Sequence, residues 1–294
     1  MKLPITAIIP TRNEESNLRA CLASVAFCER VIVADSASTD ATVAISKEAG
    51  AEAHQFVYTG GWPKKRQWAM DTLNIATPWT LLLDADERVT LELQAELARI
   101  VSDQNPADGF WITLRLVFLG RVLKHGGGNL RKLSFFRTGS ARFECLIAEQ
   151  TAEMADIEIH EHVMVKGREG VCRAPILHEN VNSLFRYIEK HNEYSTWSAE
   201  LARRLLAGEG AAGDARTPTP TGSQADRRRW MMNILWRAPC AGLTLPVLRF
   251  LYFYILRAGF LDGAAGFYYC GFKAVQAFHT MAKLRETNTG KARR

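Results

Sequence analysis

The sequence has no paired-cysteine motif, no long uncharged run and none of the usual phosphate-binding loops. Its six cysteines show no C-x-x-C spacing and the N-terminus does not resemble a signal peptide, so we expect a reducing cytosol. The longest uncharged runs of the C-terminal part, residues 238–248 and 263–272, are well short of the ~20 residues that span a bilayer. No transmembrane helix is therefore expected.

Glycine-rich nucleotide signatures are also missing. No G-x-G-x-x-G follows the first apolar run, and G-x-x-x-x-G-K-[ST] occurs nowhere in the chain. Dinucleotide and P-loop sites are therefore not expected. A sugar-nucleotide pyrophosphorylase is disfavoured for the same reason, because P-T-R-N-E stands where its glycine-rich loop would be.

Charge is distributed unevenly along the 294 residues. Residues 227–294 contain twelve Lys or Arg and two Asp or Glu, a net charge of +10, whereas the preceding part carries −4. The basic residues alternate with aromatic and aliphatic ones, a composition that suits an anionic membrane surface better than nucleic acid. We therefore expect no nucleic-acid partner.

Short apolar runs alternate with helical patterns in the first part of the chain. Strands are predicted at residues 5–9, 31–34, 51–57 and 81–83, with helices through residue 25, to about residue 49 and over 64–75. Such a β-α-β-α-β-α-β order predicts an α/β fold, with a parallel sheet that helices cover on both faces.

Acidic residues follow the fourth predicted strand directly. Asp84 and Asp86 come after the apolar run 81–83, at the edge of a parallel sheet where ligands bind. Alternate residues of an extended chain point the same way, so the two carboxylates can converge on one hard cation. This pattern indicates a metal–diphosphate site, and the alternative is a solvated acidic loop.

Four segments in this order resemble family 2 glycosyltransferases of the GT-A fold: I-I-P-T-R-N-E, V-A-D-S-A-S-T-D-A-T, K-K-R-Q-W-A and L-L-L-D-A-D-E. The stretch H-E-N-x-x-x-L-F-R-Y-I-E-K-H-N-x-Y-S is similar to lipopolysaccharide core glucosyltransferases within that family. The resemblance covers about residues 3–200 and a later D-G-x-x-G-F. It implies a mixed, mostly parallel sheet flanked by helices, and an inverting, metal-dependent transfer of a hexose.

The resemblance also implies roles for individual residues. Pro10, Arg12 and Glu14 would line the nucleotide pocket, and Asp35 would contact the base. Lys65 and Arg66 would approach the nucleotide. Asp84 and Asp86 would hold the diphosphate through Mg²⁺ or Mn²⁺. Two of these residues have simpler explanations. Glu14 can complement the charge at a helix N-terminus, and Arg66 can be a surface cation of a helix.

An inverting transfer needs a base that takes the proton of the acceptor hydroxyl. Glu161 in the segment I-E-I-H-E-H is our first candidate, and Asp156, Glu158 and Glu179 remain possible. His178 follows a short predicted strand and is expected to complete the metal's shell, to touch the phosphates, or to be an ordinary residue at a helix entry.

Composition suggests three parts of the chain. Residues 1–206 are expected to form the catalytic domain, 207–226 a linker that cannot form a core, and 227–294 a basic, helical, membrane-associating extension. An oligomer interface is the alternative task for the extension. We expect a cytoplasmic protein that is peripheral on the inner face of the cytoplasmic membrane.

The expected reaction follows from the resemblance. The donor would be a nucleotide sugar, in the first place UDP-glucose, and the acceptor a lipid-linked saccharide such as the lipopolysaccharide inner core. A polyprenyl-phosphate glycosyltransferase is the alternative enzyme, although such proteins usually carry clear spanning helices. A non-catalytic membrane-surface protein that has kept the fold is the alternative outside enzymes.

Overall fold

The computed structural model describes residues 2–145, 162–179, 183–207, 219–221, 224–237 and 241–291. These residues form two compact units. The first unit contains residues 2–122, 128–144 and 162–179, and the second contains 123–127, Cys145 and the described residues from 183 onward.

Four parallel strands lie side by side in the first unit, in the order β3-β2-β1-β4. They are β1 (Leu3–Thr11), β2 (Cys28–Asp35), β3 (Glu52–Gln55) and β4 (Trp79–Leu82). The connecting helices are α1 (Glu15–Ser24), α2 (Thr42–Glu48) and α3 (Lys65–Thr72). The predicted order of strands and helices is thereby confirmed.

The sheet continues beyond β4 as a mixed sheet, in the order β8-β6-β12-β5. Its further strands are β5 (Glu87–Val89), β6 (Gly109–Phe118), β7 (Arg121–Val122), β8 (Asn129–Arg137), β11 (Glu169–Val171) and β12 (Ile176–Glu179). Strand β8 runs antiparallel to β4 and β6, whereas β12 is parallel to β6 and antiparallel to β5. The small β9 (Ala141–Phe143) and β10 (Val163–Val165) form a separate pair.

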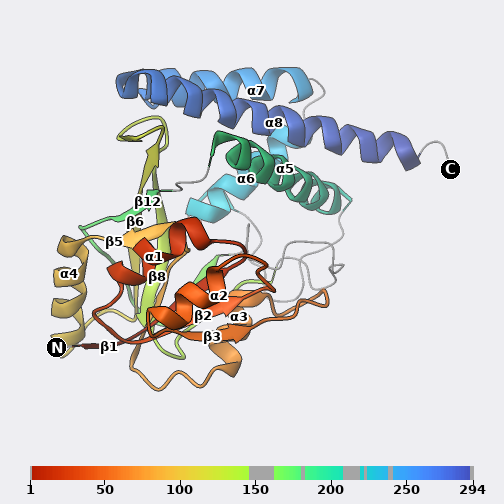
Figure 1. Cartoon of the computed structure of the whole chain (residues 1–294). Helices are drawn as coiled ribbons and strands as arrows, with labels where there is room; N and C mark the ends of the chain where they lie inside the picture. Colours follow the sequence, from red (N-terminus) through yellow and green to blue (C-terminus); the bar gives the residue numbers. More distant parts are fainter. Residues whose placement is uncertain are drawn as a thin grey trace. The chain divides into compact units, whose positions relative to one another are not determined.

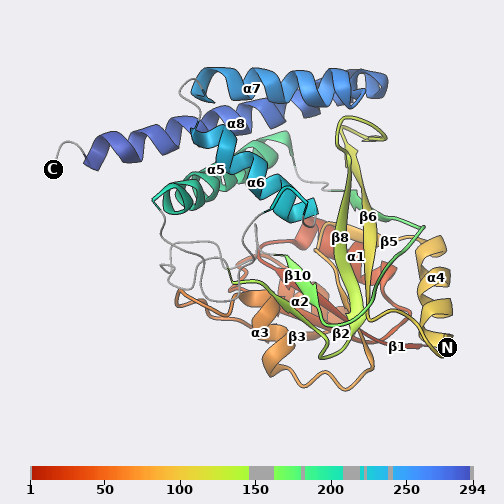
Figure 2. The same cartoon turned by 180° about the vertical axis from the view of Figure 1, so that it is seen from behind.

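Other elements cover both faces of the sheet, and this explains why the L-L-L run at the end of β4 contains no polar residue. Successive side chains of a strand point to opposite faces. Accordingly, Leu81 and Leu83 belong to the core beneath α1, α2 and α4 (Leu91–Ser102), whereas Leu82 belongs to the core beneath α3. Figure 1 shows α1 and α2 in front of the parallel strands, and Figure 2 shows α3 and β10 on the side seen from behind.

The second unit is helical. It contains α5 (Leu184–Leu206), α6 (Gln224–Arg237), α7 (Ala241–Leu251), the π-helical η1 (Tyr252–Leu256), the 3₁₀-helical η2 (Gly259–Asp262) and α8 (Gly263–Lys291). Helices α7 and α8 lie side by side in both views, and α5 and α7 contribute Ala199, Ala202 and Leu245 to a core with two residues of α8.

The D-G-x-x-G-F segment has a structural role in this second unit. Asp262 is buried and accepts hydrogen bonds from the backbone N–H groups of Lys124 (3.1 Å) and His125 (2.8 Å). A Cβ atom on Gly266 would lie 2.1 Å from the carbonyl oxygen of Gly259, so only glycine fits there. The acid and the second glycine therefore fix the segment 123–127 and the turn before α8.

The contacts group the described residues from 183 onward with the second unit, and the predicted division at residues 206 and 226 stays a prediction. Helix α5 lies in the second unit and packs against α8. Residues 208–218 and 222–223 of the predicted linker lie outside the described residues.

Among the described helices, none is by itself long and apolar enough to cross a bilayer. The segments Thr244–Leu256 and Gly259–Glu286, which are bent by 71° at their break, meet the length and hydropathy requirement only as a pair.

Candidate active site

Two polar loops meet where β1 and β2 end. Parallel neighbours have their carboxyl ends at one edge of a sheet. The backbone N–H of Asn13 donates to Ser38 Oγ (2.8 Å), and Asn13 Oδ1 accepts from the backbone N–H of Thr39 (2.8 Å). Asn13 (φ 55°) and Ala37 (φ 50°) have left-handed backbones, which is unfavourable for Ala37 and is typical of loops at functional sites. The two loops are thus fixed against each other.

Asp35, which the resemblance places at the base, ends β2. Oδ1 of its carboxylate accepts from Thr11 Oγ1 (2.9 Å) and Ser38 Oγ (2.5 Å), and Oδ2 accepts from Ser38 N (2.9 Å) and Gln55 Nε2 (3.0 Å). Burial raises the pKa of Asp35, but these hydrogen bonds outweigh it and lower the pKa below its ordinary value. A carboxylate has about four acceptor positions, and all four are used here. Asp35 therefore orders the loops in this structure, and contact with the base stays a prediction.

Three residues of the predicted nucleotide pocket lie at the end of β1 and the start of α1. Pro10 is a buried residue of β1, and Arg12 is exposed in the loop. Glu14 precedes α1, where its backbone N–H donates to Thr42 Oγ1 (2.8 Å) and its Oε2 accepts from Asn17 Nδ2 (2.8 Å). These contacts agree with the simpler explanation for Glu14 at a helix start. Its nucleotide role remains a prediction.

The first turn of α3 brings two buried cations to the same edge. Lys65 is 1% exposed, and its Nζ donates to the carbonyl oxygen of Thr11 at the end of β1 (2.7 Å). Arg66 is also buried and forms an ion pair with Asp84, so it is not a solvated surface cation of the helix.

Asp84 lies at the centre of a cluster of four charges. Its other oxygen accepts from Lys132 Nζ (3.0 Å), which also contacts both carboxylate oxygens of Glu87 (3.1 and 3.0 Å). Glu87 is completely buried and accepts from the backbone N–H of Asp84 (2.9 Å). The two cations come from α3 and β8 and the two acids from the end of β4 and from β5. Both carboxylate oxygens of Asp84 are thus paired with cations in this structure, and its predicted role as a metal ligand stays a prediction.

The charges of this cluster are set by the balance of burial and pairing. Burial would raise the pKa of Asp84, but Arg66 and Lys132 hold it well below its ordinary value. Burial raises the pKa of Glu87 and Asp84 adds to this effect, against the opposing charge of Lys132. Asp84 is therefore ionised at neutral pH.

Sequence analysis did not identify Lys132 or Glu87 as site residues. A signal for Lys132 exists, because it is a cation within a strand whose neighbours from Leu133 to Phe136 are all buried. Its partners lie more than forty positions earlier in the chain, and only the antiparallel pairing of β8 brings them together.

Asp86 and His178 form a second pair at the same edge. His178 Nε2 lies 3.2 Å from Asp86 Oδ2, because β12 runs antiparallel beside β5 and places His178 opposite Glu87. The backbone N–H of Glu179 donates to the carbonyl oxygen of Asp86 (2.9 Å). Burial would lower the pKa of His178, but Asp86 raises it to about 9. His178 lies within β12, beside the acidic loop, and its role as a metal ligand stays a prediction.

The Asp86–His178 pair fits two positions around a divalent cation. Ligands at ~2.1 Å in an octahedron are about 3.0 Å apart when adjacent, close to the 3.2 Å observed. Among the described residues no three His, Cys, Asp or Glu side chains gather as a complete metal site. Mg²⁺ commonly takes its remaining ligands from substrate phosphates and water. His178 must lose its proton to bind metal.

The candidates for the base are divided between described and undescribed residues. Glu161, Asp156 and Glu158 lie outside the described residues. Glu179 is described, ends β12 and forms an ion pair with Arg88 of β5. That pairing occupies Glu179 in this structure, and the assignment of the base to Glu161 stays a prediction.

Comparison with known proteins identifies the family. The model of glycosyl transferase family 2 matches residues 6–162. Two similar proteins are a lipopolysaccharide core biosynthesis glycosyltransferase LpsC of Rhizobium meliloti, 26% identical over 99% of this chain and 96% of that protein, and an uncharacterized glycosyltransferase of Rickettsia typhi, 26% identical over 96% of this chain and 87% of that protein.

One solved structure is similar over almost the whole chain. It is the mannosyltransferase PcManGT of Pyrobaculum calidifontis in complex with GDP-Man and Mn²⁺, with a TM-score of 0.50 and 14% identity over 97% of this chain and 88% of that one. This likeness supports the GT-A fold. Because the family model spans more than half of the residues, this chain belongs to glycosyl transferase family 2 and is a glycosyltransferase.

Proposed function

We propose that this glycosyltransferase transfers a hexose, with inversion, from a nucleoside diphosphate sugar to a lipid-linked saccharide such as the lipopolysaccharide inner core. The observation that carries the proposal is the row of carboxylates and cations at one sheet edge, with Asp84 beside Arg66 and Lys132 and Asp86 beside His178. Similarity to a lipopolysaccharide core glycosyltransferase supports the acceptor. UDP-glucose is the first donor to test.

The leaving diphosphate gains charge during the reaction and needs countercharge. We propose that Asp86 and His178 hold Mg²⁺ or Mn²⁺, which would neutralise the diphosphate as a Lewis acid when bound. The mannosyltransferase with the similar fold contains Mn²⁺ and a nucleotide sugar. Arg66 and Lys132 lie at the same sheet edge, where they pair with Asp84 and Glu87. We assign them the further role of facing the diphosphate, because preorganised cations stabilise a developing anion at little reorganisation cost.

The acceptor hydroxyl must lose its proton as it attacks, and we assign this step to Glu161. Glu161→Gln removes the base and keeps the shape, so donor affinity should stay unchanged while turnover falls by ~10²-fold or more. The measurement is the rate of UDP release from UDP-glucose in the presence of a lipid-linked saccharide, with donor affinity from calorimetry. Glu179→Gln is the matched control. Wild-type turnover in Glu161→Gln would reject this assignment.

Membrane association is proposed for the second unit. Many large apolar side chains of α7, η1, η2 and α8 are exposed: Val247, Leu248, Leu251, Tyr252, Ile255, Leu256, Phe260, Leu261, Phe267, Tyr268, Val275 and Phe278. Soluble monomers seldom expose so much apolar surface in a short stretch. The cations Arg249, Arg257 and Lys273 lie in the same stretch, and arginines with aromatic neighbours suit an anionic headgroup region.

Point substitutions test this surface without removing helices. Leu256→Glu with Leu261→Glu should sharply reduce sedimentation with vesicles that contain phosphatidylglycerol, because both side chains are exposed and would no longer enter the bilayer. Val57→Glu with Leu91→Glu, equally exposed in the first unit, is the control and should bind as wild type. High salt should release only part of the wild-type protein, since salt screens charges but not apolar burial. Wild-type protein that ignores these vesicles at low salt would leave an oligomer interface as the role of the surface.

A further inference from the structure

An arginine-lined cleft lies on β6 and β8, on the sheet face that Lys132 does not use. Arg115 of β6 is paired with Asn129 of β8, and Thr113 with Arg131. Residues directly opposite in an antiparallel pair share a face, so Arg115 and Arg131 are diagonal neighbours. Lys132 is the next residue of β8 and points to the opposite face, toward Asp84. The cleft is therefore separate from the carboxylate edge.

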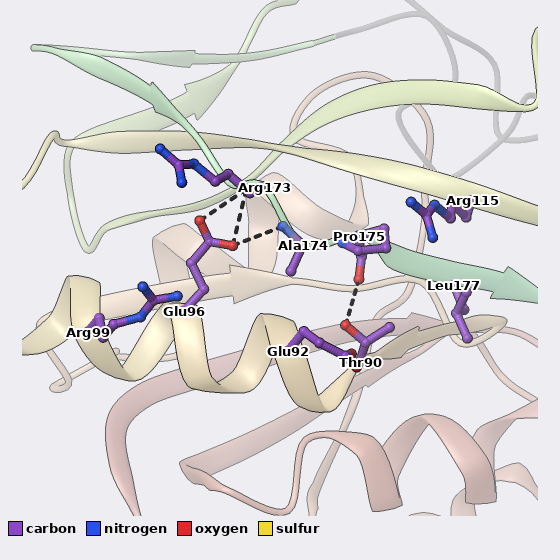
Figure 3. A pocket seen from close by; sticks show the side chains of 9 residues that line it. All are labelled: Thr90, Glu92, Glu96, Arg99, Arg115, Arg173, Ala174, Pro175 and Leu177. Atoms are coloured by element: carbon purple, nitrogen blue, oxygen red, sulfur yellow. Dashed lines mark hydrogen bonds between the residues drawn. The ribbon is translucent and has the colours of Figure 1, made fainter. Parts of the chain in front are cut away.

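The cleft is large enough for a small molecule. A part of about 300 Å³ is lined by Thr113, Arg115, Asn129, Arg131, Arg173 and Pro175. It shares Arg115, Arg173 and Pro175 with a part of about 500 Å³, which runs along α4 from Glu92 to Arg99 (Figure 3). Small-molecule sites typically have volumes of ~300 to ~1,000 Å³.

The guanidinium groups of Arg115, Arg131 and Arg173 are not paired with any of the described side chains. Within the part of the chain that the structure describes, no side chain forms a hydrogen bond or ion pair with the guanidinium groups of Arg115, Arg131 or Arg173. Glu96 lines the larger part, but its carboxylate accepts from the backbone N–H groups of Arg173 (3.0 Å) and Ala174 (2.9 Å). Figure 3 shows its carboxylate turned to the backbone of Arg173 and Ala174.

The two parts of the cleft differ in their acidic residues. Glu92 and Glu96 belong to the larger part, and no acidic side chain is among the residues that line the smaller one. Arg115 and Arg131 are exposed like charges at diagonal positions of neighbouring strands, where such charges are destabilising. Arg173, also exposed, lines both parts of the cleft, and Arg99 lines the larger one. A bound anion would remove this repulsion. Guanidinium forks match the oxygens of phosphate and carboxylate in bidentate pairs.

We propose that Arg115, Arg131 and Arg173 form an oxyanion site that takes a phosphate or carboxylate group on a small ligand, separate from the nucleotide-sugar edge. Strand β12 carries Leu177 into the cleft and the next residue, His178, to the carboxylate edge. An occupant of the cleft therefore does not compete with the donor for the Asp86–His178 pair.

Calorimetric titration of the full-length protein at low ionic strength tests this site, because salt screens exposed charges. The probes are inorganic phosphate, glucose 6-phosphate and glucuronate. Arg115→Gln with Arg131→Gln should weaken binding of the best probe by about tenfold or more, the scale expected for lost charge-assisted hydrogen bonds. Lys47→Gln with Arg121→Gln makes the same change in net charge on exposed residues outside the cleft and should bind as wild type.

The probes also distinguish the sources of the anion. Tighter binding of glucose 6-phosphate or glucuronate than of inorganic phosphate would show that the group belongs to a saccharide, and equal binding would show a free anion. Both outcomes support the site if the control pair is unaffected and the cleft pair still binds UDP-glucose as wild type does. Equal probe binding by the cleft pair and wild type overturns the proposal. Absence of binding of all three probes to wild type at millimolar concentration overturns it as well.

Discussion

Asp86→Ala should abolish hexose transfer and remove the stabilisation that a nucleotide sugar gives in the presence of Mn²⁺. Asp86 is 7% exposed and faces His178 at 3.2 Å, so the substitution leaves a partly exposed imidazole without its carboxylate and the proposed metal without a ligand. Wild-type protein with donor at ~100 times its dissociation constant should gain ~2.7 kcal/mol of stability. The variant should gain none, as measured by thermal unfolding with and without donor and metal.

A control separates loss of the site from loss of the fold. Asp103 is an exposed aspartate at the end of α4, and Asp103→Ala should keep both turnover and donor-dependent stabilisation. Asp86→Ala should keep the far-UV circular dichroism of the wild type. If Asp86→Ala transfers hexose at the wild-type rate, the metal position lies elsewhere.

Lys132→Met should destabilise the protein by about 3 kcal/mol, because breaking a buried ion pair leaves an uncompensated charge. Lys132 Nζ contacts Asp84 and completely buried Glu87. Urea unfolding should show a lower midpoint with an unchanged slope. Turnover should fall as well, since Asp84 would lose one of the two cations that hold it at the strand tip.

The double variant Lys132→Met with Glu87→Gln is the matched test. Burial already raises the pKa of Glu87, so this site disfavours a charged group, and removing both charges should restore most of the lost stability. A double variant as unstable as Lys132→Met would show that packing of the lysine stem, and not charge pairing, sets the stability of the cluster.

The contribution of Asp84 to the free energy of unfolding changes with pH in a definite direction. Its pKa is lower in the folded state than in the unfolded chain, so its ion pairs contribute stability at neutral pH. This contribution is lost as the pH falls through the folded-state pKa. The raised pKa of Glu87 has the opposite effect on the free energy of unfolding over part of this pH range.

The arrangement of the sheet was predictable because its signals are local. Residues 5–9 and 81–83 are short apolar runs that end in polar residues, and both are central strands. The acidic tip of β4 was predictable for the same reason. Local patterns do not contain partner information, which explains why the ion pair of Arg66 and the contacts of Lys132 came only from the structure.

Two further differences have physical causes. The resemblance places Asp35 at the base, and the structure adds that Thr11 and Gln55 reach its carboxylate from neighbouring strands and use its acceptors. Helix α5 follows the sheet in sequence without a break in composition, yet its packing against α8 assigns it to the second unit. Contacts between distant segments decide both cases, and no local pattern encodes them.

Transfer of labelled glucose from UDP-glucose to lipopolysaccharide truncated in the inner core is the most direct test of the proposed function. The wild-type protein should move label into the lipid-linked saccharide with Mn²⁺ or Mg²⁺, release UDP in equal amount and stop after chelation by EDTA. Other nucleotide sugars should be tested in parallel, because the carboxylates and cations at the sheet edge suit a diphosphate but do not identify the sugar. Transfer at an unchanged rate in EDTA, or no transfer from any nucleotide sugar with metal present, would contradict the account.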